Sequence, residues 1–366
     1  MTPRSLAEGL TSYFLQNGNF FAAGGILSGS AIPSATLSAI HRDGAGFSGL
    51  AVQAVGHTVT DGVDESQLDE QDRPGVHIYV ARGSKKYLED LPGEVGGIPC
   101  TVHNIGKLVV KPNQSAFTTN RGQLYERRKR IACGSSCAPS GRQYAGTLGA
   151  LVRKKGSPKT VYALSNNHVF ADCNHTAVGQ PILSPSGTDG RPGIRAPREI
   201  CRHSEMVELR SGEPSLVAPC REDVAIAEIT DADLVSSWQG DEQQGYDTPT
   251  AIAEPKTGLK VKKFGRTTGL TSGTMQSEQV RTDIPYEAQF FRALVWFQGV
   301  WVIRSNDGEP FALGGDSGSL VVTEDHKAAV GLIFAASMKD GTALVVPFQR
   351  IAGLFGGLGL VNKHNV

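Results

Sequence analysis

Gly315-Asp316-Ser317-Gly318-Ser319 is the run of residues on which the interpretation of this chain rests, because it holds a serine between glycines. A tight turn of this kind aims the backbone N–H groups of Gly315 and Ser317 at one spot. That spot can hold the negative oxygen of a tetrahedral acyl intermediate while the Ser317 hydroxyl attacks a carbonyl carbon. A chain with 44 glycines also forms such runs in plain turns, so the motif alone does not decide the chemistry.

Two residues upstream give the serine the partners that it needs. A serine is a feeble nucleophile unless a histidine takes its proton and an acid holds that histidine in the right tautomer. His168 follows a β-rich run that begins at Val161, and Asp223 heads the alternating apolar run Asp223-Val224-Ala225-Ile226-Ala227-Glu228-Ile229. The order His, Asp, Ser is that of the chymotrypsin class rather than of subtilisins or α/β-hydrolases. The three residues together are therefore a strong signal of acyl-transfer chemistry.

Each of these assignments has an alternative. His168 could cap a strand end, and His175 is a rival base, although it lacks the strand-and-turn context. Asp223 could be an ordinary turn residue, and Glu222 beside it is a rival acid. The joint pattern favours His168, Asp223 and Ser317 over these alternatives.

Residues 143–366 resemble trypsin-like (chymotrypsin-fold) serine peptidases in three places. Gly146 to Val152 is similar to the strand ahead of the family's histidine, and Leu164-Ser165-Asn166-Asn167-His168-Val169 stands for its Thr-Ala-Ala-His-Cys segment. Val330-Gly331-Leu332-Ile333-Phe334-Ala335-Ala336 resembles the strand that lines the substrate cleft. More narrowly, Ser-Asn-Asn-His-Val at 165–169 and Gly-Arg-Thr-Thr-Gly-Leu-Thr at 265–271 are similar to the bacterial and plant subgroup related to the rice narrow-leaf protein.

The resemblance implies a mainly β fold of two six-stranded antiparallel β-barrels over residues 143–366. It also implies a small α+β domain in front, which we place at residues 1–112, with residues 113–142 as a polar and basic linker. Leu6, Leu10, Tyr13 and Phe14 recur at helical spacing and predict a helix over residues 4–16. Residues 48–59 and 76–81 are strand-like, residues 97–103 and 106–110 suggest a hairpin pair, and the acidic residues 61–72 suggest a solvated loop.

The resemblance further implies the mechanism and the substrate pocket. His168 would take the Ser317 proton, Asp223 would orient His168, and the Gly315 and Ser317 amides would form the oxyanion hole. The residue six before the nucleophile, which forms the pocket floor in the family, is Phe311 here. Together with Phe334, Ala335 and Ala336 it suggests an apolar pocket that prefers small or medium apolar residues over Lys or Arg.

The basic run Arg127-Arg128-Lys129-Arg130 has three interpretations. A solvated charged face is favoured, because charge runs usually are that. A nucleic-acid patch is less favoured, since Tyr125 is the only aromatic residue close by. Cleavage after Arg130 would free an amine at Ile131 that could pair with Asp316, as in trypsin-like zymogens, but Ala132 and Cys133 depart from that pattern.

Composition narrows the class of function. Lys plus Arg and Asp plus Glu both number 36, so no global field favours nucleic acid or a membrane. No run reaches the length of a membrane helix, and the apolar run at residues 20–27 lies too far inside to be a secretory core, so we expect a cytoplasmic protein. Six cysteines do not make a disulfide framework, and Cys133 and Cys137 lack a second ligand pair for zinc, so we expect free thiols, no metal and no cofactor.

The sequence therefore predicts a serine endopeptidase that acts on protein or peptide substrates through an acyl-enzyme. The alternative is a latent or partner-gated scaffold that keeps the triad without using it, and a broader esterase is a third reading. Relatives suggest that the chain can form a homo-oligomer.

Overall fold

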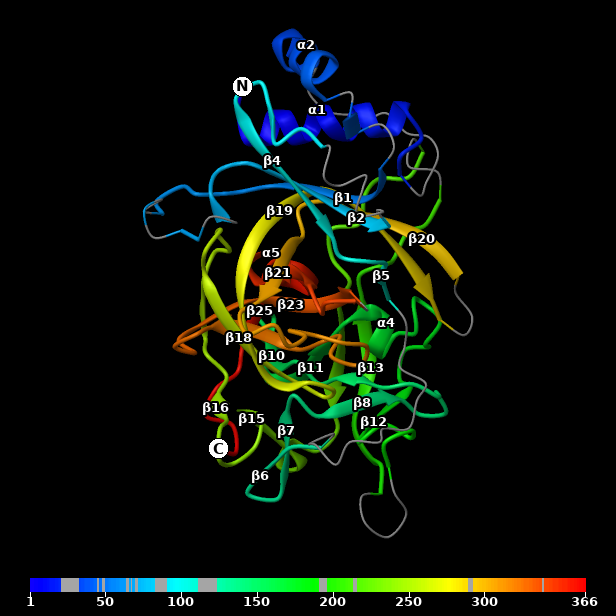
Figure 1. Ribbon diagram of the computed structural model, residues 1–366. Coiled ribbons are helices and arrows are strands. Elements are labelled where there is room, and N and C mark those ends of the chain that lie inside the picture. Colours follow the sequence, from blue (N-terminus) through cyan, green and yellow to red (C-terminus); the bar gives the residue numbers. More distant parts are fainter. Residues whose placement is uncertain are drawn as a thin grey trace.

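The computed structural model describes residues 1–20, 33–44, 46–47, 50–63, 66, 68–69, 72–82, 91–110, 124–190, 196–212, 216–288, 292–337 and 339–366. Strands dominate these residues, and helices are few and short outside the first 43 residues. In Figure 1 the amino-terminal helices lie at one end of the molecule and the carboxyl terminus lies near the other. Parts of the predicted acidic loop and residues 113–123 of the predicted linker lie outside the described residues.

The N-terminal unit (the described residues of 1–110) begins with the predicted helix. Thr2 accepts a hydrogen bond from the Ser5 amide and Ser5 reciprocates, while Pro3 supplies a fixed φ at the first helical position. Leu6, Leu10 and Phe14 are fully buried along one face, which confirms the predicted helix. The elements of this unit are α1 (Pro3–Gln16), α2 (Ser34–Asp43), β1 (Ala51–His57), β2 (Val76–Arg82), β3 (Glu94–Val95), β4 (Ile98–Asn104) and β5 (Leu108–Val109).

The strands of the N-terminal unit do not form the predicted hairpin. β4 pairs in parallel with β2 and antiparallel with β3, whereas β5 pairs with β23 (Ala328–Ser337) of the distant carboxyl-terminal part. The hairpin prediction for residues 97–110 is therefore wrong. Both segments look like strands in the sequence, but their partners lie elsewhere in the chain.

A closed antiparallel barrel of six strands forms the carboxyl-terminal part of the chain. Its order is β18-β22-β23-β24-β21-β19, and pairing of β18 with β19 closes the ring. Met275, Ile303 and Val345 are among the fully buried side chains that fill one of its cores. The strands are β18 (Lys260–Gly265), β19 (Gly269–Glu287), β21 (Trp301–Ser305), β22 (Leu320–Thr323), β23 and β24 (Ala343–Pro347), with β17 (Ala251–Ile252) on β23, β20 (Arg292–Phe297) on β19, and α5 (Phe348–Ile351) after β24.

The long strand β19 joins this barrel to the N-terminal unit. Ala54 and Val55 of β1 lie opposite Thr282 and Arg281 of β19, so the sheet continues from the barrel through β1, β2 and β4 to β3. Helix α1 packs against β1, β2 and β19. Figure 1 shows this layer, with α1 lying across the strands at one end of the barrel. The N-terminal unit therefore has its own core but shares its sheet with the barrel.

The middle of the chain, together with β25 near the carboxyl terminus, forms an open antiparallel sheet, which we call the first half. Its order is β25-β10-β11-β14-β13-β12-β8-β9, and a second small sheet runs β16-β15-β7-β6. The mainly β architecture with barrel-like antiparallel halves confirms the predicted fold class. The elements are β6 (Glu126–Arg127), β7 (Arg130–Cys133), β8 (Ser136–Pro139), β9 (Gly146–Thr147), β10 (Ala150–Lys154), β11 (Ser157–Ser165), α4 (Asn167–Phe170), β12 (Pro181–Ser184), β13 (Arg198–Met206), β14 (Ala225–Ile229), β15 (Val235–Gln239), β16 (Tyr246–Asp247) and β25 (Leu358–Leu360), with 3₁₀ turns at Ala232–Leu234 and Leu354–Gly356.

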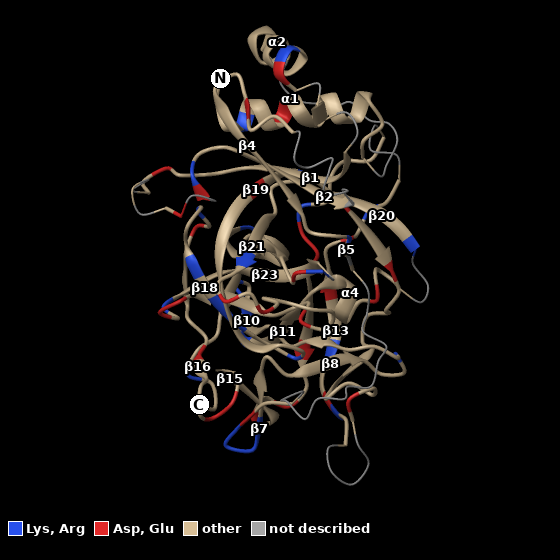
Figure 2. Cartoon of the chain, in the orientation of Figure 1, with Lys and Arg blue, Asp and Glu red and all other residues tan. Residues whose placement is uncertain are grey.

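Three of these strands lie where the sequence suggests a linker. β6, β7 and β8 occupy residues 126–139, and the basic run forms the turn between β6 and β7. Arg128 and Lys129 take positive φ there, and the Arg127 guanidinium lies 4.2 Å over the Trp238 ring. This turn is the blue tip beside β7 in Figure 2. The run is thus the tip of a hairpin and makes contacts within the molecule. The sequence does not reveal it, because short polar strands carry no apolar pattern.

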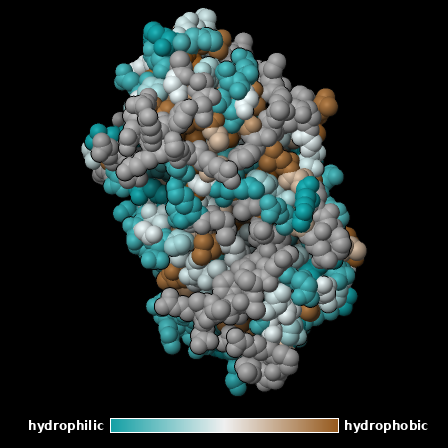
Figure 3. Space-filling model, turned by 45° about the vertical axis from the view of Figure 1, so that its right-hand side comes forward, coloured by the Kyte–Doolittle hydropathy of each residue, from teal (hydrophilic) through white to brown (hydrophobic). Residues whose placement is uncertain are grey.

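The surface carries both charge signs without one dominant field. Figure 2 shows Lys and Arg interspersed with Asp and Glu over the length of the molecule. On the face drawn in Figure 3, hydrophobic residues form small separate areas among hydrophilic ones. No helix among the described residues has the length and apolar character to cross a membrane.

Candidate active site

The first half carries His168 on a one-turn helix directly after a buried strand. β11 ends at Ser165, and α4 places His168 in its second position. Asn166 donates its side-chain amide to the Asp223 carbonyl at 2.7 Å, and Asn167 donates to the Val207 carbonyl at 2.7 Å. The two asparagines of the Ser-Asn-Asn-His run therefore fix the helix to both neighbouring segments.

The pairing of β11 with β14 brings Asp223 to this helix. Ser165 lies opposite Ala225, so Asp223, two residues before the strand, faces α4. Asp223 Oδ2 lies 2.6 Å from His168 Nδ1, and Asp223 Oδ1 accepts the His168 backbone N–H at 3.2 Å. Asp223 is fully buried and His168 is 3% exposed. This arrangement can hold Nδ1 protonated and leave Nε2 as the base.

Tyr286, which the sequence interpretation missed, completes the surroundings of Asp223. It lies in β19 of the closed barrel, and its hydroxyl donates to Asp223 Oδ2 at 2.8 Å. Burial, and next the charge of Asp223, raise the pKa of Tyr286 well above its ordinary value, so the hydroxyl remains a donor. Its ring meets the His168 ring edge-on, with centroids 6.0 Å apart. A residue of the closed barrel therefore contacts the buried Asp223 of the first half.

Ser317 lies on the turn that leads into β22 of the closed barrel. Gly315 and Gly318 have φ of +98° and +96°, which L side chains rarely adopt. A Cβ at Gly318 would also collide with Ser165 Oγ. The Ser317 carbonyl accepts the Thr147 N–H at 2.8 Å, which binds the turn to the first half.

The Ser317 hydroxyl donates to the Phe334 carbonyl of β23 at 3.3 Å. Among the described residues it makes no hydrogen bond to the His168 ring. Ser317 is partly exposed, whereas the acid and the histidine are buried. A change of one side-chain torsion would swing Oγ away from Phe334, since staggered rotamers are the accessible alternatives.

The backbone of this turn is held by its carbonyl groups. Thr147 donates its hydroxyl to the Gly315 carbonyl and Thr267 donates to the Gly314 carbonyl, both at 2.8 Å. The amides of Gly315 and Ser317 donate to no acceptor among the described residues. With the carbonyls fixed and the amides unused, the turn has the donors that an oxyanion hole requires.

Asp316, beside the nucleophile, is fully buried and saturated with donors. Its Oδ1 accepts the backbone N–H groups of Thr267 and Thr268 at 2.8 and 3.1 Å, and its Oδ2 accepts the Leu313 N–H at 2.9 Å. The Lys263 ammonium lies 3.7 Å from Oδ2 and is also fully buried. Burial lowers the pKa of Lys263, and the charge of Asp316 opposes that shift.

This network bears on the idea of cleavage after Arg130. Asp316 has its cationic partner, Lys263, within the intact chain. Ile131 is buried in β7, between β6 and β15. Cleavage is therefore not needed to supply Asp316 with a positive charge. The Gly-Arg-Thr-Thr-Gly-Leu-Thr run, which the sequence offers only as a subgroup signature, supplies two of the amides that hold Asp316.

The four residues predicted to line the substrate pocket lie around the nucleophile turn and β23. Phe334, Ala335 and Ala336 are consecutive in β23, and the Phe334 carbonyl contacts Ser317. Phe311 is fully buried in a core of the closed barrel, and its carbonyl accepts the Thr271 hydroxyl at 2.8 Å. Their roles in binding substrate stay predictions.

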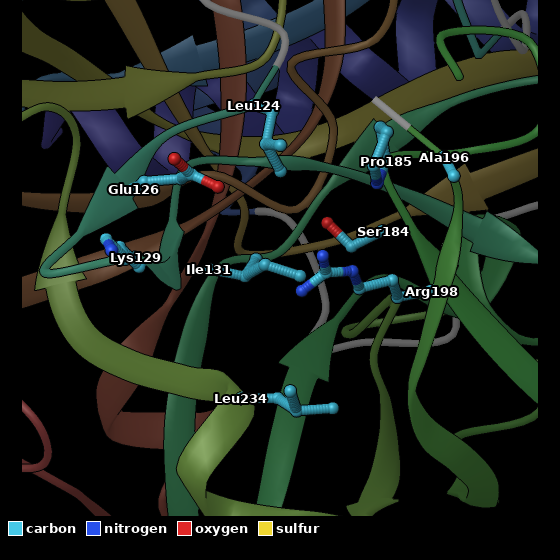
Figure 4. A pocket seen from close by; sticks show the side chains of 9 residues that line it. All are labelled: Leu124, Glu126, Lys129, Ile131, Ser184, Pro185, Ala196, Arg198 and Leu234. Atoms are coloured by element: carbon cyan, nitrogen blue, oxygen red, sulfur yellow. The ribbon is translucent and has the colours of Figure 1, made fainter. Parts of the chain in front are cut away.

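Two cavities lie away from these residues. One, of about 220 Å³, is drawn in Figure 4, where Arg198 extends toward Ile131 and Glu126 and Lys129 come from the β6–β7 hairpin; its lining is Leu124, Glu126, Lys129, Ile131, Ser184, Pro185, Ala196, Arg198 and Leu234. The other, of about 390 Å³, is lined by Val59, Asp61, Glu254, Pro255, Lys256, Glu278, Trp301, Pro347, Gln349 and Arg350. Neither includes a member of the predicted triad.

The cysteines and other ligand-type residues form no metal centre among the described residues. All six cysteines are buried as free thiols. Burial raises the pKa of Cys100 to about 12 and that of Cys133 still further, so these thiols stay protonated.

The closed six-stranded barrel, the open first half and the placement of the site between them define the fold of chymotrypsin-like serine proteases. No family model matches the chain. It is 26% identical over 310 residues to Protein NARROW LEAF 1 of rice (Oryza sativa subsp. japonica), which covers 75% of this chain and 50% of the rice protein. The chain thus spans about half the length of this curated relative. The predicted resemblance to the rice subgroup is confirmed.

Solved bacterial proteases are similar in structure. Protease A of Thermobifida fusca is 20% identical with a TM-score of 0.42, covering 63% of this chain and all of that protein. Nocardiopsis protease is 14% identical with a TM-score of 0.43, covering 63% of this chain and 97% of that one.

Proposed function

We propose that this protein is a serine endopeptidase that uses His168, Asp223 and Ser317 and forms an acyl-enzyme. The contact between the buried Asp223 carboxylate and His168 Nδ1, next to a glycine turn that carries Ser317, is the observation that supports this most. No other buried acid–histidine pair among the described residues lies beside a serine on such a turn.

The reaction would proceed from the resting contact of Ser317 with Phe334. Once a substrate occupies the β23 side, Ser317 Oγ turns toward His168 Nε2, gives up its proton and attacks the peptide carbonyl. Asp223, held by Tyr286, stabilises the imidazolium, and the Gly315 and Ser317 amides bind the oxyanion. His168 then protonates the leaving amine, and water releases the acyl group.

The same proposal includes a preference for small or medium apolar residues before the scissile bond. Phe334, Ala335 and Ala336 are consecutive apolar residues of β23, none more than 8% exposed, and Phe311 is fully buried in a core of the closed barrel. An apolar substrate side chain needs no charged partner in the pocket. Its binding would be driven by the apolar area that it removes from water.

Labelling with a fluorophosphonate combined with peptide turnover tests this proposal. We expect the probe to attach at Ser317, and Ser317→Ala to lose labelling and about a millionfold of turnover, because triad members fail as a unit. Peptides with Ala or Leu directly before the scissile bond should be cut faster than those with Arg at that position.

Ser305→Ala is the matched control, because Ser305 is a serine of the same barrel whose hydroxyl contacts only Asp307 in the described residues. It should keep full turnover. Peptidase activity that survives Ser317→Ala would refute the assignment. A protein that the probe never labels would instead be a latent scaffold.

A further inference from the structure

Strand β23 has one edge that is fully used and one that is divided among three segments. Along residues 331–336 one edge pairs with β24. On the opposite edge β22 pairs with Ala329 to Leu332, and the nucleophile turn follows. Gly318 donates to the Ile333 carbonyl at 2.8 Å, and Ile333 donates to the Ser319 carbonyl at 3.0 Å. A peptide that approaches Ser317 in extended form would add to this second edge.

The chain itself occupies the next part of that edge. In β5, Val109 lies opposite Ala336 and Leu108 lies opposite Ser337, in antiparallel register. β5 must use the edge opposite β24, because β24 pairs with Ala336 through Ala343. Only Phe334 and Ala335 therefore lie between the nucleophile contacts and β5. In Figure 1 the short β5 is drawn near β23, between the N-terminal sheet and the barrel.

β5 also has the direction that a substrate would have. The two strands on this edge, β22 and β5, both pair antiparallel with β23. A substrate that continued their direction would run from Ser337 toward Phe334. Continuing β5 by that register would lead its chain to Phe334, beside Ser317. The chain leaves the edge before that point, because Val110 bonds to β19 instead: its N–H donates to Pro285 and its carbonyl accepts the Glu287 N–H, both at 3.0 Å.

Several buried contacts hold this segment in place. The Gln53 side chain of β1 accepts the Leu108 N–H at 2.9 Å and donates to the Leu108 carbonyl at 2.7 Å, and Gln53 is fully buried. The Ser337 hydroxyl donates to the Ile105 carbonyl. Leu108 is fully buried and Val110 is 2% exposed. Removing β5 would leave buried polar groups without hydrogen-bond partners and would expose apolar side chains to water. We therefore treat β5 as a fixed part of the site.

We propose that β5 blocks the edge of β23 on which an extended substrate would bind. Only two substrate residues before the scissile bond can then pair with β23. The third and fourth residues of an extended substrate would need the positions that Val109 and Leu108 hold. The N-terminal unit thereby sets the length of substrate that the site recognises, favouring short or bent upstream segments. This inference rests on the proposed peptidase function.

A length series of acyl-peptide substrates tests the inference. Acylated substrates with one, two, three and four residues before the same amide leaving group are compared by kcat/KM. We expect a rise from one residue to two and less than a twofold change from two to four. An open edge would add two backbone hydrogen bonds and raise kcat/KM about tenfold or more, and that result would overturn the proposal.

Failure of the proposed function is seen separately, with the same preparation. A fluorophosphonate without a peptide part reports whether Ser317 is reactive, independently of the upstream positions. Absence of labelling rejects the peptidase function and this inference with it. Labelling combined with a steep length dependence rejects the inference alone.

A cross-link tests whether β5 must leave the edge of β23 before a substrate can be cleaved. Leu108 and Ser337 lie directly opposite each other, so Leu108→Cys with Ser337→Cys can form a disulfide. The oxidised form should cleave the two-residue substrate at the same rate as its own reduced form, which is the control. A loss of more than tenfold on oxidation, reversed by reduction, would show that the segment has to move and would overturn the proposal.

A loosened segment should extend the site. Gln53→Ala removes both contacts to the Leu108 backbone, and we expect kcat/KM to gain a dependence on the third residue of about threefold or more. Thr11→Val is the control, because Thr11 is a buried polar residue of the same unit whose hydroxyl donates to the Ala7 carbonyl within α1. If the Gln53 variant is unfolded, the cross-link and the length series still decide.

Discussion

His168 and Asp223 in the first half are already in contact, whereas Ser317 in the closed barrel donates its hydroxyl to a carbonyl of its own barrel. The acid and base depend on neutral donors, the Asn166 amide and the Tyr286 hydroxyl among them. The turn that carries Ser317 also has neutral donors, the Thr147 and Thr267 hydroxyls, but it adds a buried ion pair of Asp316 with Lys263.

This difference suggests a division of labour. In the proposed mechanism the first half would supply the base, with Asp223 at its Nδ1. The closed barrel would supply the serine and the two amides of its turn. Breaking the first should remove chemistry while the fold persists, and breaking the second should weaken the fold as well.

Asp223→Asn should have the largest effect. The amide can no longer hold Nδ1 protonated in the required tautomer, so kcat should fall by about 10⁴-fold with little loss of stability. Steady-state kinetics together with thermal unfolding check both statements. Glu222→Gln is the control that separates the rival acids and should stay within about twofold of the parent. Equal losses in the two variants would leave Asp223 without its assigned role.

Lys263→Met should act on stability. It leaves the buried Asp316 carboxylate without its cation, which costs about 3–5 kcal/mol of unfolding free energy. Labelling of Ser317 should slow because the turn loses its anchor. Denaturant unfolding and labelling rates measure the two effects. Lys263→Met combined with Asp316→Asn should recover part of the stability, and a single variant as stable as the parent would contradict this account.

Tyr286→Phe should have the smallest effect of the three, and it tests the one contact that crosses from the closed barrel to the acid. Loss of a hydrogen bond to a carboxylate should lower kcat/KM about tenfold. Because the hydroxyl contacts Asp223 and not the substrate, the loss should fall on kcat rather than on KM. Steady-state kinetics measure both constants, and a raised KM with an unchanged kcat would indicate a packing role only.

The sequence predicts those parts of the site whose signals are local. The glycine turn at Ser317 and the asparagine-flanked His168 each have a recognisable neighbourhood, and β11 and β14 place Asp223 by register. Tyr286, Lys263 and Gln53 have no such neighbourhood, since each acts on a residue at least 53 positions away. A single polar residue in an apolar strand gives no sign of its partner.

The fold shows the same limit. Helix α1 is predictable because its cap and its apolar face lie within 15 residues. The hairpin predicted at residues 97–110 fails because β5 pairs with a strand more than 200 residues away. The linker prediction differs from the structure because Glu126–Arg127 is polar and only two residues long. Non-local pairing, not local propensity, decides these segments.

The shared strand β19 has a consequence for how the chain can be divided. A protein cut at residue 112 would lose β1, and the backbone of β19 from Glu278 to Thr282 would lose its partner. An exposed strand edge with unpaired N–H and C=O groups pairs with other chains and favours aggregation. We therefore expect residues 113–366, prepared without β1, to self-associate through the exposed edge of β19.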